Sequence, residues 1–151
     1  MNKKLSENRT THLVFLREEP LREIVAGRKR FEIRLSFRGL ACASVREGDV
    51  LLLKRVGGGV EAACDLGEVR MYRGLRPEEV ERLARRYADA ASRPYLQRGV
   101  PPRNHHRPVH VAVIELLNVR GASLPAKLRP RRVRSGWVAD LGGALATRGG
   151  S

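Results

Sequence analysis

The pattern of hydrophobic and polar positions divides the chain into short segments, most of which predict strands. Apolar stretches at residues 12–16, 50–56 and 109–119 each predict a strand. Residues 61–72 follow the second stretch after three glycines, which predicts a hairpin. Residues 29–35 alternate between apolar and charged side chains, so we expect a strand with one buried face and one charged face.

Two segments predict helices. Pro20 fits the first turn of a short helix, and Gly27 fits its end, because glycine tolerates the left-handed backbone that closes helices. Residues 77–92 repeat apolar side chains at helical spacing, with acids first and arginines later, as the helix dipole favours. Residues 123–138 predict one more short strand around a basic loop. Short strands with few helices predict an α+β fold or a small barrel rather than alternating strand–helix units.

The length and the ends of the chain predict a single-domain protein. A chain of 151 residues is long enough to bury one hydrophobic core. We expect a polar arm at residues 1–11, a folded domain at 12–138 and a Gly/Ala-rich tail at 139–151. No apolar run approaches the roughly 18 residues of a membrane-spanning helix, and the arm lacks the apolar core of a signal peptide. We therefore expect a cytoplasmic protein without a membrane partner.

Charge is the most informative feature of the composition. Thirty basic residues oppose sixteen acidic ones, which gives a formal net charge of +14, and 25 of the basic residues are arginine. The guanidinium fork clamps phosphates and stacks on bases, so the surplus predicts a nucleic acid partner. A GC-rich genome would explain arginine in place of lysine, but it would not explain the surplus.

A motif connects this charge to a known family. Segment 27–34 reads Gly-Arg-Lys-Arg-Phe-Glu-Ile-Arg and follows the predicted first helix, and a Gly-Asp turn at 48–49 precedes the strand at 50–56. This order resembles the ASCH domain family, whose pattern is Gly-x-Lys-x-x-Glu-x-Arg and then a Gly-Asp turn. The resemblance covers about residues 13–117. It implies a small PUA-like β-barrel with flanking helices and a role in RNA metabolism, with single-stranded RNA or a nucleotide bound in a basic cleft.

The same resemblance yields candidate catalytic residues. By position, the motif residues are Lys29, Glu32 and Arg34. Some ASCH proteins are ribonucleases or amidohydrolases of acetylated cytidine, so metal-independent hydrolysis is the alternative to RNA binding alone. In the amidohydrolase branch a threonine stands where this chain has Glu32. A basic protein-interaction subunit is the second alternative.

The residue types themselves allow both roles for this segment. Glu32 could serve as a general base, and Arg34 could stabilise charge on phosphate oxygens. Equally, Glu32 and Arg34 could form only a salt bridge, and Lys29 could be only a phosphate contact.

Further basic residues extend the predicted RNA surface. Arg28 and Arg30 flank the motif lysine, and Trp137 follows an arginine-rich stretch. Such a stretch suits single-stranded RNA, whose phosphates bind cations and whose bases stack on rings. The alternative for Trp137 is a core position that closes the barrel. The predicted RNA-contacting residues are Arg28, Arg30, Arg129, Arg131, Arg132, Arg134 and Trp137.

The remaining reactive side chains predict neither a metal site nor a cofactor. Cys42 and Cys64 lack metal-ligand spacing, and we expect both to be buried in strands. Three histidines lie close in sequence, but no cysteine or carboxylate stands at metal-ligand spacing from them: His105, His106 and His110. Glu115 shares strand parity with its apolar neighbours. We expect it either to point inward and pair with Arg34 or to lie exposed at the barrel rim.

Overall fold

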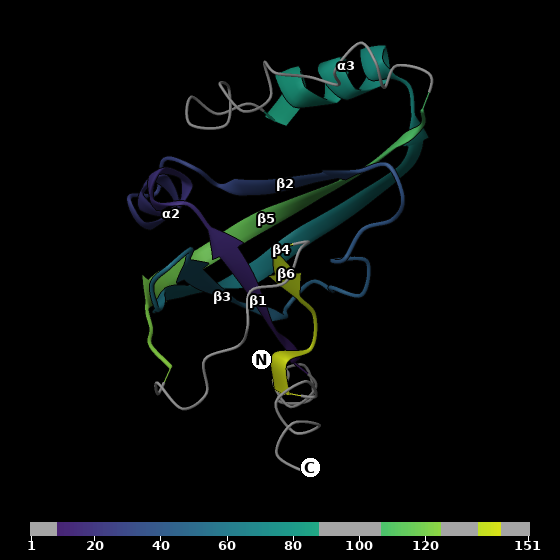
Figure 1. Ribbon diagram of the computed structural model, residues 1–151. Coiled ribbons are helices and arrows are strands. Elements are labelled where there is room, and N and C mark those ends of the chain that lie inside the picture. Colours follow the sequence, from purple (N-terminus) through teal and green to yellow (C-terminus); the bar gives the residue numbers. More distant parts are fainter. Residues whose placement is uncertain (1–8, 88–106, 125–135, 143–151) are drawn as a thin grey trace.

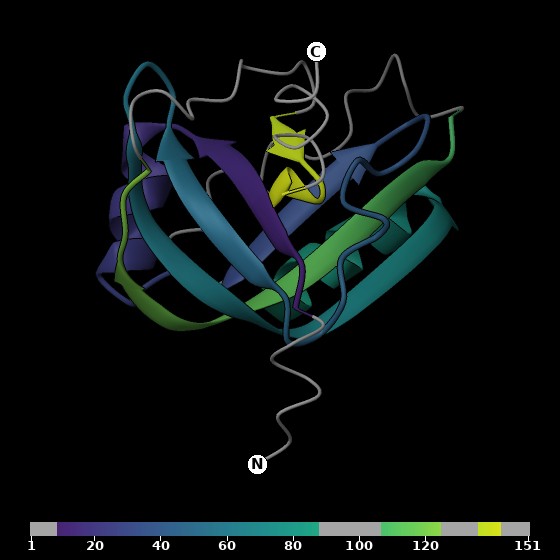
Figure 2. The ribbon, with the colours of Figure 1, turned by 90° about the horizontal axis from the view of Figure 1, so that it is seen from below.

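A curled sheet forms the body of the protein. The computed structural model describes residues 9–87, 107–124 and 136–142. Six strands in the order β2-β5-β4-β3-β1-β6 curl into a half-barrel, with two helices in the described residues (Figure 1, Figure 2). The fold is α+β, as predicted. The elements are β1 (Thr11–Leu16), α2 (Glu18–Val25), β2 (Phe31–Ser36), β3 (Val50–Arg55), β4 (Val60–Leu75), α3 (Pro77–Tyr87), β5 (Val109–Gly121) and β6 (Trp137–Val138).

The sheet is antiparallel apart from one pair of strands. β1 lies parallel to β3, whereas β6 runs antiparallel to β1 at the end of the sheet. β3 and β4 form the hairpin predicted around the three glycines. Lys54 closes this hairpin, because its buried Nζ donates to Gly58 O over 2.6 Å.

Helix α2 begins two residues before the predicted proline. Glu18 and Glu19 fill its first turn, where the helix dipole favours negative charge, and Pro20 lies in the same turn. Gly27 has φ +80° and its N–H donates to Ile24 O over 3.0 Å. Gly27 therefore ends the helix, as predicted, and turns the chain toward β2.

The folded part starts earlier than predicted. Arg9 Nε donates to Gly48 O over 2.7 Å, and Thr10 N–H donates to Asp49 Oδ1 over 3.1 Å. Thr11 is already the first residue of β1. The first eight residues, the predicted continuation of the second helix to residue 92 and tail residues 143–151 lie outside the described part of the chain. Neither described helix is long and apolar enough to cross a bilayer.

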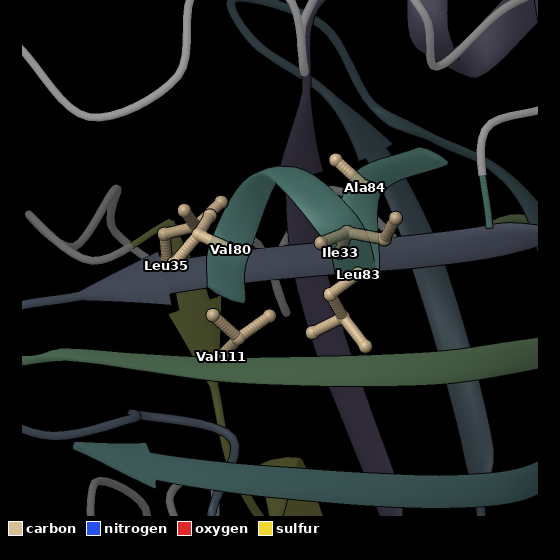
Figure 3. Close-up of a pocket in the computed structure, with 6 residues that line it drawn as sticks. All are labelled: Ile33, Leu35, Val80, Leu83, Ala84 and Val111. Atoms are coloured by element: carbon tan, nitrogen blue, oxygen red, sulfur yellow. The ribbon is translucent and has the colours of Figure 1, made fainter. Parts of the chain in front are cut away.

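The sheet buries apolar side chains on both faces. Inside the curl, strand residues pack with Leu21 and Ile24 of α2. On the outer face, α3 covers β2 and β5, and its Val80 packs with Ile33 and Val111 (Figure 1). Figure 3 shows a small hollow under α3 that is lined by Ile33, Leu35, Val80, Leu83, Ala84 and Val111. These side chains are all hydrocarbon, so this hollow offers a nucleotide no polar group.

Candidate functional site

The charged residues of β2 face the inside of the curl. In the ladder between β2 and β5, Glu32 lies opposite Ile114 and Arg34 lies opposite Ala112, and both partners belong to the inner core. Residues opposite each other in a ladder share a face, so Glu32 and Arg34 point inward. The alternation of apolar and charged faces is confirmed. Glu32 on the charged face, however, is buried and only 6% exposed.

Glu32 and Arg34 form an ion pair that leaves one acceptor unfilled. Arg34 Nε lies 2.9 Å from Glu32 Oε1, and the Arg34 side chain is 22% exposed. Glu32 Oε2 is buried and has no hydrogen-bond partner among the residues that the structure describes. Leaving a buried acceptor unpaired costs about 1–3 kcal/mol, and such atoms are rare in folded proteins. Glu32 Oε2 can therefore accept a hydrogen bond from a bound ligand.

Arg34 also connects the two ends of the sheet. β2 and β6 are the outermost strands, and β6 lies across the open side of the curl (Figure 2). Arg34 Cζ lies 5.7 Å from the centre of the Trp137 ring, which is a cation–π distance. A Cβ atom at Gly136 would lie 3.3 Å from Arg34 Nη1, so the glycine leaves room for the guanidinium. We call Glu32, Arg34 and Trp137 the seam cluster.

The two cysteines lie in the same interior. Cys42 and Cys64 are buried and free. Cys64 lies in β4, as predicted, whereas Cys42 lies in a turn between β2 and β3, so its predicted place in a strand is wrong. Burial raises the pKa of both thiols, to about 12 for Cys64. At Cys42 the Arg34 charge opposes this rise in pKa, whereas the Glu32 charge adds to the rise at both thiols. The thiols and the seam cluster therefore share one electrostatic environment.

A buried network that sequence reasoning missed positions Trp137. His12 Nε2 lies 2.8 Å from Asp49 Oδ2, and His12 Nδ1 accepts a hydrogen bond from Asp140 N–H over 3.0 Å. Because Nδ1 is an acceptor, the ring hydrogen is on Nε2, which donates to Asp49. Asp49 also accepts from two backbone N–H groups. The network ties β1 to the turn before β3 and to the segment after β6, three residues beyond Trp137.

Comparisons with solved structures identify the fold. A tyrosine-to-phenylalanine variant of the ASCH protein from Zymomonas mobilis matches with a TM-score of 0.63 and 14% identity, over 92% of this chain and 98% of that chain. A serine-to-alanine variant gives 0.62 and 14%, over 93% and 97%. The crystal structure of ASCH from Zymomonas mobilis gives 0.58 and 13%, over 93% and 96%. This chain has the ASCH fold. Neither a scan against models of protein families nor a comparison with curated proteins finds a match.

Within the ASCH fold, Lys29 lies just before β2. The strand begins at Phe31, and Lys29 Nζ donates to Phe31 O over 2.8 Å. Leu116 N–H donates to Arg30 O, so the alternating ladder turns the Phe31 carbonyl toward the free edge of β2. The structure thus brings Glu32 and Arg34 together and holds Lys29 at the strand edge. Joint catalysis by Lys29 and Glu32 stays a prediction.

Arg28 and Arg30 lie on the surface of the ASCH fold. Arg28 donates two hydrogen bonds to Glu23, over 2.6 and 2.9 Å, and these bonds raise the pKa of its guanidinium. Arg30 is exposed, with its Cζ 6.0 Å from the centre of the Phe31 ring. RNA contacts by both arginines stay predictions.

Of the C-terminal residues predicted to contact RNA, the structure describes Trp137. Its side chain is 4% exposed, and it lies opposite Val14 in the ladder between β1 and β6. Trp137 therefore occupies the core, as in the second of its two predicted roles, and does not present a ring face at the surface. The predicted basic contacts before it lie outside the described residues: Arg129, Arg131, Arg132 and Arg134.

Glu115 lies on the outer side of the sheet, opposite Phe31. Arg34 faces the other side, so the predicted pairing of these two residues is wrong. Glu115 Oε1 instead accepts from Glu68 N–H over 3.2 Å at a bulge of β4, and only glycine at position 67 leaves room for this carboxylate.

Histidines and acids do not gather into a metal site in the described part of the chain. His105 and His106 lie outside that part, and no structural statement applies to them. The third histidine of the predicted group, His110, is described. Its Nδ1 accepts a hydrogen bond from Gly74 N–H over 3.1 Å, so its contact is with the backbone of β4.

Proposed function

We propose that this chain binds single-stranded RNA in a basic cleft that includes the inner face of β2, where Glu32 and Arg34 of the seam cluster contact one nucleotide. The observation that carries the proposal is Glu32 Oε2, which lies beside the Arg34 guanidinium and has no hydrogen-bond partner in the described part of the chain. Together they offer an acceptor and a donor, which suit the edge of an unpaired base and its phosphate. The net charge of +14 favours a polyanion. The ASCH fold agrees with the RNA-associated role that the motif implies.

A purely structural role explains the seam cluster less well. Replacing a buried ion pair by apolar residues of similar volume often leaves stability unchanged or raises it. The surrounding inner core is apolar and would accept such a replacement. A charged pair whose acceptor Glu32 Oε2 meets no donor within the described residues is better explained by a ligand that fills it. Arg34, the more exposed partner, is then the first of the two to meet RNA.

The test is a double variant that removes both charges of the seam, Glu32→Leu with Arg34→Met. Its net charge stays at +14, because 29 basic residues then oppose 15 acidic ones. We expect its free energy of unfolding to stay within about 1 kcal/mol of the original. Its affinity for a labelled oligouridylate, measured by fluorescence anisotropy, should fall about tenfold or more, because a charged hydrogen bond contributes about 1.5–3 kcal/mol.

A matched control separates the seam from a general charge effect. Glu18→Leu with Arg22→Met removes an exposed ion pair of α2 by the same chemistry, and this variant should keep its affinity. Equal RNA affinity of the seam variant and the original would overturn the proposal. The same samples also test whether the chain hydrolyses RNA or acetylated cytidine. If they release shortened RNA, or acetate from acetylated cytidine, and Lys29→Ala abolishes that release, the chain is a hydrolase.

A further inference from the structure

The positive surplus of this protein is not spread evenly over the described surface. Many described arginines face a carboxylate at ion-pair distance, so their charge is already balanced locally. A phosphate that binds such an arginine has to displace the carboxylate first. The ion-paired arginines are Arg9, Arg22, Arg28, Arg34, Arg55, Arg70, Arg76, Arg85 and Arg120.

Three of the remaining described arginines lie where neighbouring strands end. Arg38 follows β2, Arg107 precedes β5, and Arg73 lies near the end of β4. None of the three has an acidic partner among residues 9–87, 107–124 and 136–142. Arg38 and Arg73 are exposed, and Arg107 is half-buried. Their charge is therefore available to an anion that approaches this end of the sheet.

His110 joins the three strand ends. It lies opposite Ser36 of β2 in the ladder, and its Nδ1 accepts from Gly74 N–H of β4 over 3.1 Å. Neighbouring strands lie about 4.8 Å apart, so arginine side chains that flank these positions can contact the same bound anion. Arg107 is held in place by stacking, with its Cζ 4.7 Å from the centre of the Phe37 ring.

His110 also adds a donor on the side of the sheet that carries the seam. Because Nδ1 accepts from the backbone, the ring hydrogen is on Nε2 and can be donated. The ladder places His110 opposite Ser36 and Ala112 opposite Arg34, so His110 and Arg34 lie on the same face, two pairs apart along it. The inner face therefore carries one further donor, His110, at the strand ends.

We infer that Arg38, Arg73, Arg107 and His110, which we call the strand-end cluster, bind phosphates of the RNA next to the nucleotide at the seam. The inference rests on the proposed function and extends it from one nucleotide to a strand. Guanidinium groups without an acidic partner can clamp phosphates directly and release their counterions. An RNA strand that runs from the seam along β2 would meet this cluster.

The experiment compares two triple variants that lose the same charge. Arg38→Gln, Arg73→Gln and Arg107→Gln together remove the three arginines of the strand-end cluster. Arg22→Gln, Arg70→Gln and Arg85→Gln together remove arginines that are paired with glutamates. Affinity for the labelled oligouridylate is measured over a series of salt concentrations. Each phosphate contact on a single strand contributes about 0.7 to the slope of log K against log salt. The strand-end triple should make this negative slope shallower by about 2, since three contacts are lost. The paired triple should change the slope by clearly less.

The outcomes separate this inference from the proposed function. Equal slopes for the two triples would overturn the inference that the strand-end cluster binds phosphates. The salt dependence would then reflect only the net charge of the protein. A seam variant that loses affinity beside a strand-end triple that keeps it would leave the proposed function intact and end this inference. The reverse pattern would keep the cluster and end the role of the seam. If the original chain binds no oligouridylate at low salt, both fail.

Discussion

The two faces of β2 are both covered, but by different chemistry. On the outer face, Ile33 and Leu35 pack under α3, hydrocarbon against hydrocarbon (Figure 3). On the inner face, Glu32 and Arg34 place two charges inside a core whose other members are apolar. The outer contacts stabilise the fold by about 25 cal/mol for each Å² of apolar surface removed from water. The inner pair has to recover the desolvation of two charges, and so contributes much less.

This contrast changes the meaning of an alternating strand. In a sheet with one solvent-exposed face, the polar positions of an alternating strand point toward solvent. In β2, the apolar positions meet a helix and the charged positions meet the interior of the barrel, so neither face is a plain surface. Charged residues that a fold keeps inside, where apolar ones would pack as well, indicate a function for that face.

The largest expected effect comes from removing one charge of the inner pair. Arg34→Ala leaves the Glu32 carboxylate buried without its partner, so we expect a loss of about 3 kcal/mol in the free energy of unfolding, measured in urea. Adding Glu32→Gln to the same chain removes the stranded charge and should recover part of the loss. A loss below about 1 kcal/mol would instead match an exposed salt bridge, and the inner face would then be solvated.

The outer face should respond through packing alone. Ile33→Ala deletes a 6% exposed side chain beneath α3, and we expect it to cost about 2 kcal/mol, at the low end for such truncations, because one short helix can settle onto the gap. The affinity of the folded protein for oligouridylate should stay unchanged. A parallel fall in RNA affinity would contradict the division of roles between the two faces.

The sequence predicted the elements well because their signals are local. Gly27 ends α2 and the three glycines turn β3 into β4, since each position depends on the backbone preference of a single residue type. The motif also selected Glu32 and Arg34, which do meet. The face that they occupy could not be predicted, because burial of one side of β2 under α3 depends on packing between segments about fifty residues apart.

Contacts between distant segments explain the other differences. His12 stands in an apolar run, and nothing local connects it with Asp140, 128 residues away. The Gly-Asp turn was the available signal for Asp49, but only the fold shows that this carboxylate holds His12. For Glu115 the inward pairing with Arg34 was one of two alternatives, because parity along one strand does not say which face is inside. The ladder with β2 settles that question.

The smallest expected effect concerns a thiol on the inner side. Burial raises the pKa of Cys64 from 9.0 to about 12, and the Glu32 charge adds to the rise. The unfolded chain therefore loses this proton above pH 9, while the folded protein keeps it. The contribution of the Cys64 thiol to the free energy of unfolding is complete below pH 9. It is lost as the pH rises toward 12, by at most about 1.4 kcal/mol per pH unit.

Cys64→Ala should therefore reduce the difference in unfolding free energy between about pH 8 and about pH 10 by about 1 kcal/mol. The readout is this difference, because the substitution also changes the stability at both pH values through packing. Val111→Ala makes a similar truncation on the outer face without a titrating group, so it should keep the pH dependence of the original chain. If Cys64→Ala keeps that pH dependence as well, solvent reaches the thiol in the folded protein. The inner face would then be open to water, and the contrast between the two sides of β2 would be one of polarity alone.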